Sequence, residues 1–357
     1  MKENPNKVEF VFVGDVFPAN LPYNRNCGVA SLDFSDVSQE RYVNRIRKVI
    51  GHSDFLLGNL EAPVLNVDNF SKSMQFAGHP FFIRMLKLSG FSMLSLANNH
   101  MNEHSDIGID STVEALENND LDYIGLRSCS HERVIGGFKV VFLSYNAVDN
   151  NTDRICHYSE DRVCESILRY KESGYKHIFV ILHWGDEFIH RPSPRQIKAA
   201  HSFIDCGAEF VIGSHSHVVQ PVERYKEGLI CYSLGNFIFD MTIPKQTRVG
   251  MILRLTMFEN TFDYRIEYVS IDKDFFPSRI EKTKSFEDLM QKQALLMSSF
   301  DVDSYSARYN LEKRRRRLHK RISEKRLLIK NWFKYTKEIR REFISNFYNR
   351  LFGHGKA

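Results

Sequence analysis

Two apolar runs of this chain end in histidine: IFVILHWG at residues 178–185 and FVIGSHSH at residues 210–217. Short unbroken runs of Val, Ile, Leu and Phe are typical of buried strands. Each run therefore predicts a strand that carries histidine at its carboxyl end, the edge at which open α/β sheets bind ligands. His183, His215 and His217 are candidate metal ligands, because imidazole binds zinc, iron and manganese-like ions. Alternate residues of a strand share a face, so we expect His215 and His217 to lie on the same side.

The rest of the chain alternates strand-like runs with helix-like periodic segments. Helices are predicted at residues 38–50, 80–88, 106–117, 161–170 and 195–204. Strands are predicted at residues 8–13, 55–57 and 91–96, with a hairpin around Gly136-Gly137. From residue 218 onward, strand-like segments at 218–225, 229–234, 249–258 and 261–271 follow one another without helices. This order predicts an α/β fold with a late antiparallel section.

Polar motifs recur where the predicted strands end. Besides the histidines, they are Gly14-Asp15, Gly58-Asn59-Leu60-Glu61 and Asn98-Asn99-His100. Any one of these has an ordinary explanation, since Asp15 can end a strand and Asn is a common turn residue. Together they predict a site for two divalent cations, because carboxylate, amide and imidazole suit manganese, iron and zinc. Paired cations about 3.5–4 Å apart clamp a phosphoryl oxygen and ionise a water.

The chemistry of these groups assigns each a role at such a site. Asp15 and Glu61 would be the anionic ligands, and Asn99, His183, His215 and His217 would be the neutral ligands.

From Val8 to Asp240 the chain resembles the CapA-type capsule or poly-γ-glutamate biosynthesis proteins (PGA_cap) of the calcineurin-like metallophosphoesterase superfamily. The resemblance rests on GNLEAP at 58–63, ANNH at 97–100, HWGDEF at 183–188 and the run from Gly207 to Glu223, with YSLGNFIFD at 232–240. It implies a four-layer α-β-β-α sandwich with the two metal ions at one edge and with Asp15, Glu61, Asn99, His183, His215 and His217 facing them.

The resemblance also implies roles for residues that are not ligands. His100 would act on the leaving group as a general acid or a nearby cation. Around the metals or against the substrate we expect Asn59, Asn98, Glu187, Arg191 and Asn236. Arg191 has two interpretations, an anion clamp or a solvated loop residue.

The chain departs from the superfamily at one ligand position. The superfamily opens with Asp-x-His, whereas Asp15 is followed by Val16 and Phe17. One metal position would therefore lack a histidine. In addition, Gly58-Asn59 stands where Gly-Asp is usual, with the carboxylate two residues later at Glu61.

Composition bears on the cellular context. No apolar stretch reaches the roughly 18 residues of a membrane-spanning helix, and the N-terminus has no apolar signal segment. We therefore expect a cytoplasmic protein that can bind peripherally to the inner face of the membrane. The six cysteines show no C-x-x-C spacing and are predicted to be free thiols.

Charge separates the tail from the rest of the chain. Residues 311–357 hold 16 basic and 4 acidic residues, whereas residues 1–310 hold 33 and 40. The tail also has an apolar stripe at Leu328, Trp332, Tyr335, Ile339, Phe343, Phe347 and Leu351. A basic amphipathic helix suits an anionic membrane surface or a partner, and the alternative is packing on the main domain. Nucleic acid is not expected, because no nucleic-acid-binding fold accompanies the charge.

Three parts are therefore predicted: a metallophosphoesterase-like domain at 7–275, a linker with a helix at 276–310 and a basic helical tail at 311–357, which we expect to be removable without disturbing the metal site. The favoured function is a metal-dependent hydrolase, phosphoesterase-like or amide-cleaving on poly-γ-glutamate, in capsule or exopolysaccharide metabolism. The alternative is a non-enzymatic, metal-stabilised accessory of a membrane-bound polymer synthesis complex. The substrate expected for the hydrolase is an anionic or polymer-derived small molecule.

Overall fold

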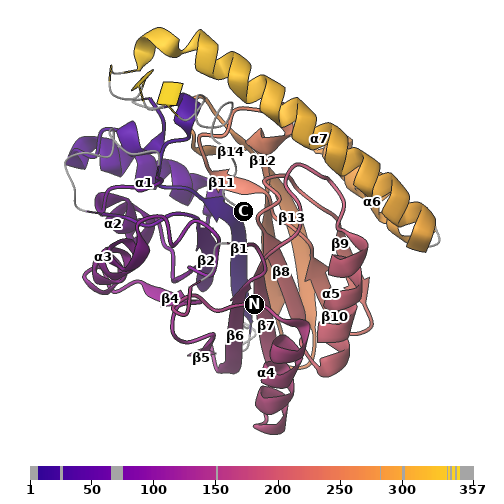
Figure 1. The fold of residues 1–357 in the computed structure, drawn as a ribbon. Helices are drawn as coiled ribbons and strands as arrows, with labels where there is room; N and C mark the ends of the chain where they lie inside the picture. The colour runs from indigo at the N-terminus through magenta and orange to yellow at the C-terminus, as the bar shows by residue number, and fades with distance from the viewer. Residues whose placement is uncertain are drawn as a thin grey trace.

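Two β-sheets lie face to face between two layers of helices (Figure 1). This is a computed structural model, and it describes residues 7–24, 27–65, 75–149, 152–281, 283–299 and 302–335, with positions 337, 340–341 and 344–345. The four-layer α-β-β-α sandwich expected from the sequence is confirmed.

The first sheet has eight strands. Its parallel part is formed by β1 (Val8–Val16), β2 (Phe55–Leu60), β3 (Met93–Ser95) and β4 (Asp122–Ile124). On the other side of β1 the strands are antiparallel: β12 (Val249–Met257), β13 (Phe262–Ile271) and β14 (Pro277–Arg279). The short strand β11 (Asn236–Ile238) pairs in parallel with the end of β1. The predicted late antiparallel section is thus part of the first sheet.

The second sheet has six strands in the order β5-β6-β7-β8-β10-β9. Their bounds are β5 (Ser130–Ile135), β6 (Phe138–Asn146), β7 (His177–His183), β8 (Phe210–Ser214), β9 (Val222–Tyr225) and β10 (Gly228–Cys231). β6, β7, β8 and β10 run parallel, so the two histidine-bearing segments are neighbours.

The alternation of side chains along β1 explains the layers. Phe10 and Phe12 point into the space between the sheets, where both contact Phe179 of β7. Val11 and Val13 point the other way, toward the helices. That outer layer is formed by α1 (Asp36–Ile50), α2 (Phe81–Leu88) and α3 (Ser105–Glu117). On the far side, α4 (Glu160–Glu172) and α5 (Pro194–Cys206) cover the second sheet.

The five predicted helices are found within two residues of their predicted bounds. α5 illustrates why the local signal suffices. The Ser193 hydroxyl accepts a hydrogen bond from the Gln196 backbone N–H, and the Gln196 side chain accepts one from the Ser193 backbone N–H. Pro194 is the first residue of the helix. Gly207 ends it in the left-handed conformation, with φ of 115°.

Three predicted strands are shorter than expected, and one of them, predicted at residues 91–96, is a strand only at Met93–Ser95. The segment 218–225 becomes a strand only at Val222, and the segment 229–234 ends as a strand at Cys231. Their remaining apolar residues are buried in loops joined by a single bridge between Val219 and Leu234. Hydrophobicity alone does not separate a buried loop from a strand, which is why the sequence misled here.

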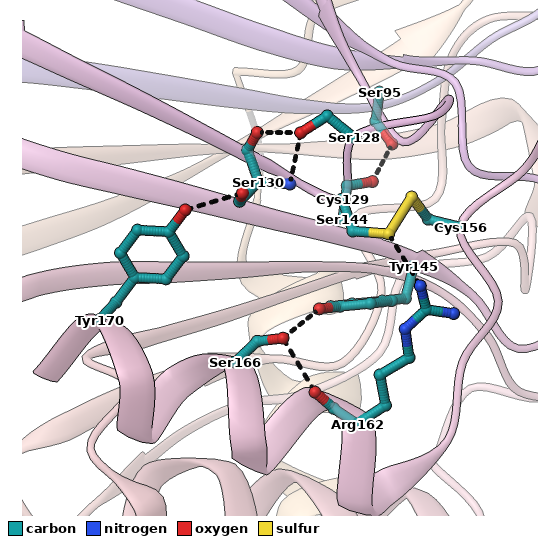
Figure 2. The surroundings of a disulfide bond; sticks show 10 residues. All are labelled: Ser95, Ser128, Cys129, Ser130, Ser144, Tyr145, Cys156, Arg162, Ser166 and Tyr170. Carbon is teal, nitrogen blue, oxygen red and sulfur yellow. Dashed lines mark hydrogen bonds between the residues drawn. A yellow bond between two sulfur atoms is a disulfide. The ribbon is translucent and has the colours of Figure 1, made fainter.

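The prediction that all six cysteines are free thiols is wrong for two of them. Cys129 and Cys156 form a disulfide, with their Cα atoms 5.5 Å apart (Figure 2). β6 aligns them, because the Cys129 carbonyl accepts a hydrogen bond from Ser144 and the Cys156 carbonyl accepts one from Asn146. Two chain segments 27 residues apart in the sequence thereby meet beside one strand. The spacing of the cysteines along the sequence does not reveal this contact.

The predicted linker at 276–310 contains β14 and α6 (Lys284–Ser299), and α7 (Val302–Lys330) begins before the tail boundary predicted at residue 311. The division into three parts stays a prediction. In the described part of the chain, no helix combines the length and the apolar character needed to cross a membrane. Of the predicted apolar stripe, Ile339, Phe343, Phe347 and Leu351 lie outside the described residues.

Candidate metal centre

The ends of five strands, β1, β2, β3, β7 and β8, bring the predicted ligands to one edge of the sandwich. On β1, Asp15 lies in register with Asn59 of β2 and with Asn236 of β11. On β7, His183 lies in register with Ser214, the last residue of β8. The carboxyl ends of these parallel strands therefore meet, as the sequence predicted.

His183 is at the centre of the cluster. Its Nε2 atom lies 2.8 Å from Asn99 Oδ1 and 3.1 Å from His215 Nδ1. Glu61 Oε1 is 3.7 Å from the same nitrogen. Three groups that are far apart in the sequence thus converge on one imidazole nitrogen.

Glu61 is fully buried, and among the described residues neither of its carboxylate oxygens has a hydrogen-bond partner. Burial, followed by the charges of Asp15 and Glu187, raises the pKa of Glu61 well above its usual value. Burying a polar group without a hydrogen bond costs roughly 2–7 kcal/mol of folding free energy, and burying a charged carboxylate in the same way costs more. A cation bound beside Glu61 would remove that cost.

Asp15 and His217 complete the cluster. Asp15 Oδ2 lies 3.4 Å from His217 Nδ1, and His217 Nε2 lies 3.5 Å from Glu61 Oε1. Glu61, His215 and His217 each offer an atom within 4.8 Å of the others. The structure therefore brings together all six predicted ligands.

The two histidines after β8 converge for a different reason than predicted. The strand ends at Ser214, so strand alternation does not orient His215 and His217. Both residues instead have positive φ, at 92° and 55°. Such backbone conformations are costly for residues with a side chain and cluster at functional sites.

Burial keeps two of the rings in the form that binds metals. Burial, and after it the nearby histidines, lowers the pKa of His183 well below its usual value. Burial likewise lowers the pKa of His215 to about 4, although Glu187 opposes the shift. Both rings are therefore neutral at neutral pH and have a lone pair for a cation. With the partnerless Glu61, this donor set fits a divalent metal ion.

The predicted asparagines orient the ligands. Asn59 donates a hydrogen bond to Asp15 Oδ1 at 2.9 Å. Asn98 donates to the Leu60 carbonyl and to Asn59 Oδ1, at 2.7 Å and 3.2 Å. Asn236 Oδ1 lies 3.0 Å from His217 Nδ1. Each therefore contacts a predicted ligand or the residue beside one.

His100 lies at the rim of the cluster and is about a quarter exposed. Its Nδ1 atom is 2.8 Å from Glu103 Oε1, and its Nε2 atom is 3.2 Å from the Asn99 amide nitrogen. The ring also packs edge-on against Phe76. These contacts hold the imidazole next to a predicted ligand; its role as a general acid stays a prediction.

Phe17, which stands where the superfamily has a histidine, is completely buried. Its ring stacks on Phe239 with centroids 4.4 Å apart, within a cluster of apolar residues. Phe239 in turn contacts the His217 ring. An aromatic wall thus occupies the side of the site next to His217.

The loop between β7 and α5 (residues 184–193, the site loop) is covered by α7, a contact that the sequence did not specify. Glu187 Oε1 lies 3.9 Å from His217 Nε2, and its other oxygen lies 2.7 Å from Lys320 Nζ. Asp186 binds Tyr309 and Lys313, at 2.9 Å and 2.6 Å. The tail therefore packs on the main domain, the alternative that the sequence left open, through contacts between residues more than a hundred positions apart. That the metal site survives removal of the tail stays a prediction.

Arg191 is also held by α7. Its guanidinium lies 2.7 Å from Glu312 and above the ring of Tyr305. The group is mostly buried. Its predicted role as an anion clamp stays a prediction.

The family model of the bacterial capsule synthesis protein PGA_cap matches residues 9–241. Capsule biosynthesis protein CapA of Bacillus anthracis is 32% identical over 221 residues, which is 56% of this chain and 54% of that protein. PGA biosynthesis protein CapA of Bacillus subtilis is 28% identical over 238 residues, with 57% and 62% covered. The chain thus spans little more than half the length of these relatives.

Two solved structures were compared as well. A novel phosphatase from Mycoplasma pneumoniae has a TM-score of 0.49 at 12% identity, with 74% of this chain and 94% of that chain covered. The 5'-nucleotidase precursor from Thermus thermophilus has a TM-score of 0.47 at 13% identity, with 82% and 60% covered. The function proposed below depends on neither.

The match to the family model spans more than half of the chain and includes every predicted ligand. The chain belongs to the bacterial capsule synthesis protein family PGA_cap.

Proposed function

We propose that this protein is a metal-dependent hydrolase of the metallophosphoesterase type that acts in capsule, exopolysaccharide or poly-γ-glutamate metabolism. The observation that carries the proposal is Glu61, a buried carboxylate that faces His183 and His217 and whose two oxygens have no hydrogen-bond partner among the described residues. A buried carboxylate without a hydrogen bond destabilises the fold. A bound cation needs such an anionic ligand, so metal binding explains why the group is there.

The proposed site holds two divalent ions, manganese, iron or zinc. Glu61, His215 and His217 would form one part of it, and Asp15, Asn99 and His183 would complete it. Bound divalent ions polarise a phosphoryl or carbonyl oxygen and lower the pKa of a water.

Other residues would prepare the site for that chemistry. Asn59 fixes the Asp15 carboxylate, and Glu103 fixes the His100 ring. From the rim, His100 would donate a proton to the departing oxygen or nitrogen of the substrate. Phe17 and Phe239 exclude water from the side of His217.

The polymer context comes from the relatives. Those named above are capsule or PGA biosynthesis proteins, and a protein of Mycobacterium tuberculosis, 26% identical over 219 residues, is described as a probable polyglutamine synthesis accessory protein. The substrate we propose is therefore an anionic, polymer-derived or lipid-linked molecule, with a phosphoester or a γ-glutamyl amide as the bond that is cut.

Phe17 favours one alternative function. With an aromatic side chain in place of a histidine ligand, the metal centre would be structural, and the protein would be a non-enzymatic accessory of a polymer synthesis complex.

The disulfide bears on the cellular location of the protein. Disulfides persist in oxidising compartments, so the Cys129–Cys156 bond weighs against the cytoplasmic location expected from the sequence.

The test is to purify the full chain, measure bound manganese, iron and zinc, and assay phosphomonoesters, phosphodiesters and poly-γ-glutamate. His183→Ala and His217→Ala should lose metal and turnover, while His52→Ala, a change at an exposed histidine, should lose neither. Bound metal without turnover of any substrate would favour the accessory function. An absence of bound metal after reconstitution would overturn both.

A further inference from the structure

We propose that α7 docks the protein onto an anionic lipid surface through the face that it turns away from the domain. The docking goes beyond the proposed function and does not depend on it; only its consequence for the substrate rests on the proposed hydrolase.

The first observation is an exposed apolar stripe. Leu311, Leu318, Ile322 and Ile329 are 52%, 61%, 44% and 74% exposed. At 3.6 residues per turn these four positions fall within about 40° of one another around the helix axis. Phe333, just after α7, is 88% exposed. Aliphatic residues this exposed are unremarkable singly, but a continuous stripe marks an interaction site.

The second observation is the charge beside the stripe. Arg314, Arg315, Arg321, Lys325 and Arg326 are all exposed and lie on both sides of it. Among the described residues, none of these five forms an ion pair with an acidic group. We call the four apolar and five basic residues the outer face of α7.

The opposite side of α7 holds the helix in place. Tyr305 donates a hydrogen bond to the Pro192 carbonyl at 2.7 Å, and Tyr309 contacts Asp186. Leu327 and Leu328 pack on the apolar cluster around Phe17. Leu328, part of the apolar stripe for which the sequence left membrane, partner and main domain open, therefore points to the domain. The docking face is the other side of the helix.

Two of the three acidic residues of α7 follow the same division, whereas Asp303, in the first turn ahead of the stripe, is exposed. Glu312 binds Arg191 and Arg316, and Glu324 lies near Lys320, so both belong to the inner side. From Leu311 onward, where the stripe lies, both acidic groups of α7 are therefore turned inward, and the outer face is cationic and apolar. Figure 1 shows α7 along one edge of the sandwich, with its outer side clear of the rest of the ribbon.

This composition selects a lipid surface over other occupants. A second copy of α7 would bring like charges together, which disfavours self-association. Single-stranded nucleic acid binds where aromatic rings stack on bases, and the outer face has aliphatic residues instead. An apolar stripe flanked by Arg and Lys matches the boundary between anionic headgroups and acyl chains. Each basic residue near such a surface strengthens binding about fivefold.

The docking would place the metal centre near the membrane. The inner side of α7 reaches the site loop through Lys320 and Glu187, and Glu187 faces His217. A helix with its side chains is about 10–12 Å thick. The site would therefore lie about one helix diameter from the lipid, which suits an anionic substrate attached to a lipid.

The experiment is co-sedimentation of the full chain with vesicles of phosphatidylcholine, alone or mixed with phosphatidylglycerol. We expect binding only to the mixed vesicles, weakening as salt rises. The double variant Arg314→Gln/Arg315→Gln should bind about 25-fold more weakly. Leu318→Gln/Ile322→Gln should also weaken binding, whereas Arg41→Gln and Val134→Gln, at exposed positions on α1 and β5, should not.

The proposal is overturned if binding to the mixed vesicles is absent or is unchanged in both outer-face variants. It is also overturned if truncation after residue 335 removes binding while both variants retain it. Size-exclusion chromatography and an RNA-binding assay on the same variants test the other occupants: a dimer or an RNA complex lost with Leu318→Gln/Ile322→Gln would reassign the face. Bound metal is measured on the same samples. Because vesicle binding does not require metal, a failure of the docking proposal can be told apart from a failure of the proposed function.

Discussion

Lys320 of α7 lies 2.7 Å from one carboxylate oxygen of Glu187, whose other oxygen lies 3.9 Å from Nε2 of the candidate ligand His217. Burial alone would raise the pKa of Glu187, but Lys320, His217 and His215 together lower it to about 2. The C-terminal helix is therefore electrostatically part of the candidate metal centre.

Lys320→Gln should destabilise the protein and change its acid sensitivity. The pKa of Glu187 is lower in the folded protein than in the unfolded chain, so the ionised carboxylate stabilises the fold above pH 4.5. This stabilisation is lost as the pH falls toward 2. Because the pair is partly exposed, we expect a loss of about 1 kcal/mol at pH 7 in urea unfolding. The loss should shrink below pH 4. Lys325→Gln is the control, since Lys325 faces solvent, and an equal effect there would contradict the importance of the ion pair.

Glu61→Gln should have opposite effects on the metal-free and metal-loaded protein. Without metal, the substitution removes a buried carboxylate that has no partner, so the unfolding temperature measured in chelator should rise. With metal, loss of the anionic ligand should abolish most of the stabilisation by manganese, which is about 2.7 kcal/mol at 100 times Kd. Differential scanning calorimetry measures both. A metal-free variant less stable than the parent would mean that the carboxylate has another partner.

Asp240→Asn should remove a pH dependence of stability. Burial raises the pKa of Asp240 to about 7, so its contribution is favourable at low pH and is lost as pH rises from about 4 to 7. The loss amounts to roughly 4 kcal/mol. Urea unfolding of the variant from pH 4 to 8 should therefore give a flatter profile than the parent. Asp205→Asn, at an exposed carboxylate, should leave the profile as it is.

Gly14→Ala should disturb the position of Asp15. A Cβ atom at Gly14 would lie 1.8 Å from the Gly235 carbonyl oxygen, which also accepts a hydrogen bond from the Asp15 backbone. Because backbone must move, we expect a loss of about 2–3 kcal/mol and weaker metal binding, measured by unfolding and by calorimetric titration. At Gly90, where an added Cβ meets nothing within 4 Å but φ is 100°, alanine should cost about 1–3 kcal/mol through backbone strain and spare metal binding.

Removal of the disulfide should lower stability without touching the metal centre. A crosslink that closes a loop of 27 residues contributes about 3–4 kcal/mol in the chain-entropy model. Cys129→Ser/Cys156→Ser should lose about that much in unfolding experiments under oxidising conditions, whereas Cys27→Ser, at an exposed thiol, should lose little. Peptide mapping without reductant should recover the Cys129–Cys156 pair. Recovery of both thiols in free form would show that the bond does not form.

Much of the fold could be predicted because its signals are local. The helices follow from period, caps and flanking Gly or Pro, as at Ser193, Pro194 and Gly207. Asp15, Glu61 and His183 could be singled out because each follows a buried strand, and parallel strands end at a common edge. The failures at residues 218–221 and 232–234 come from loops as apolar as strands.

By itself, the sequence determined the order of most strands and helices, though not the short strands β4, β11 and β14, and it determined the set of candidate ligands. It could do so because hydrophobic period, turn residues and strand-end chemistry are properties of neighbouring positions. Only the tertiary structure decided that Cys129 meets Cys156, that Phe17 closes one side of the site and that Lys320 reaches Glu187 across 133 positions. It also decided which face of α7 is free, because the charge of a helix does not reveal which side packs on the domain. Such pairings depend on how separate elements pack in space, and no local pattern of residues encodes them.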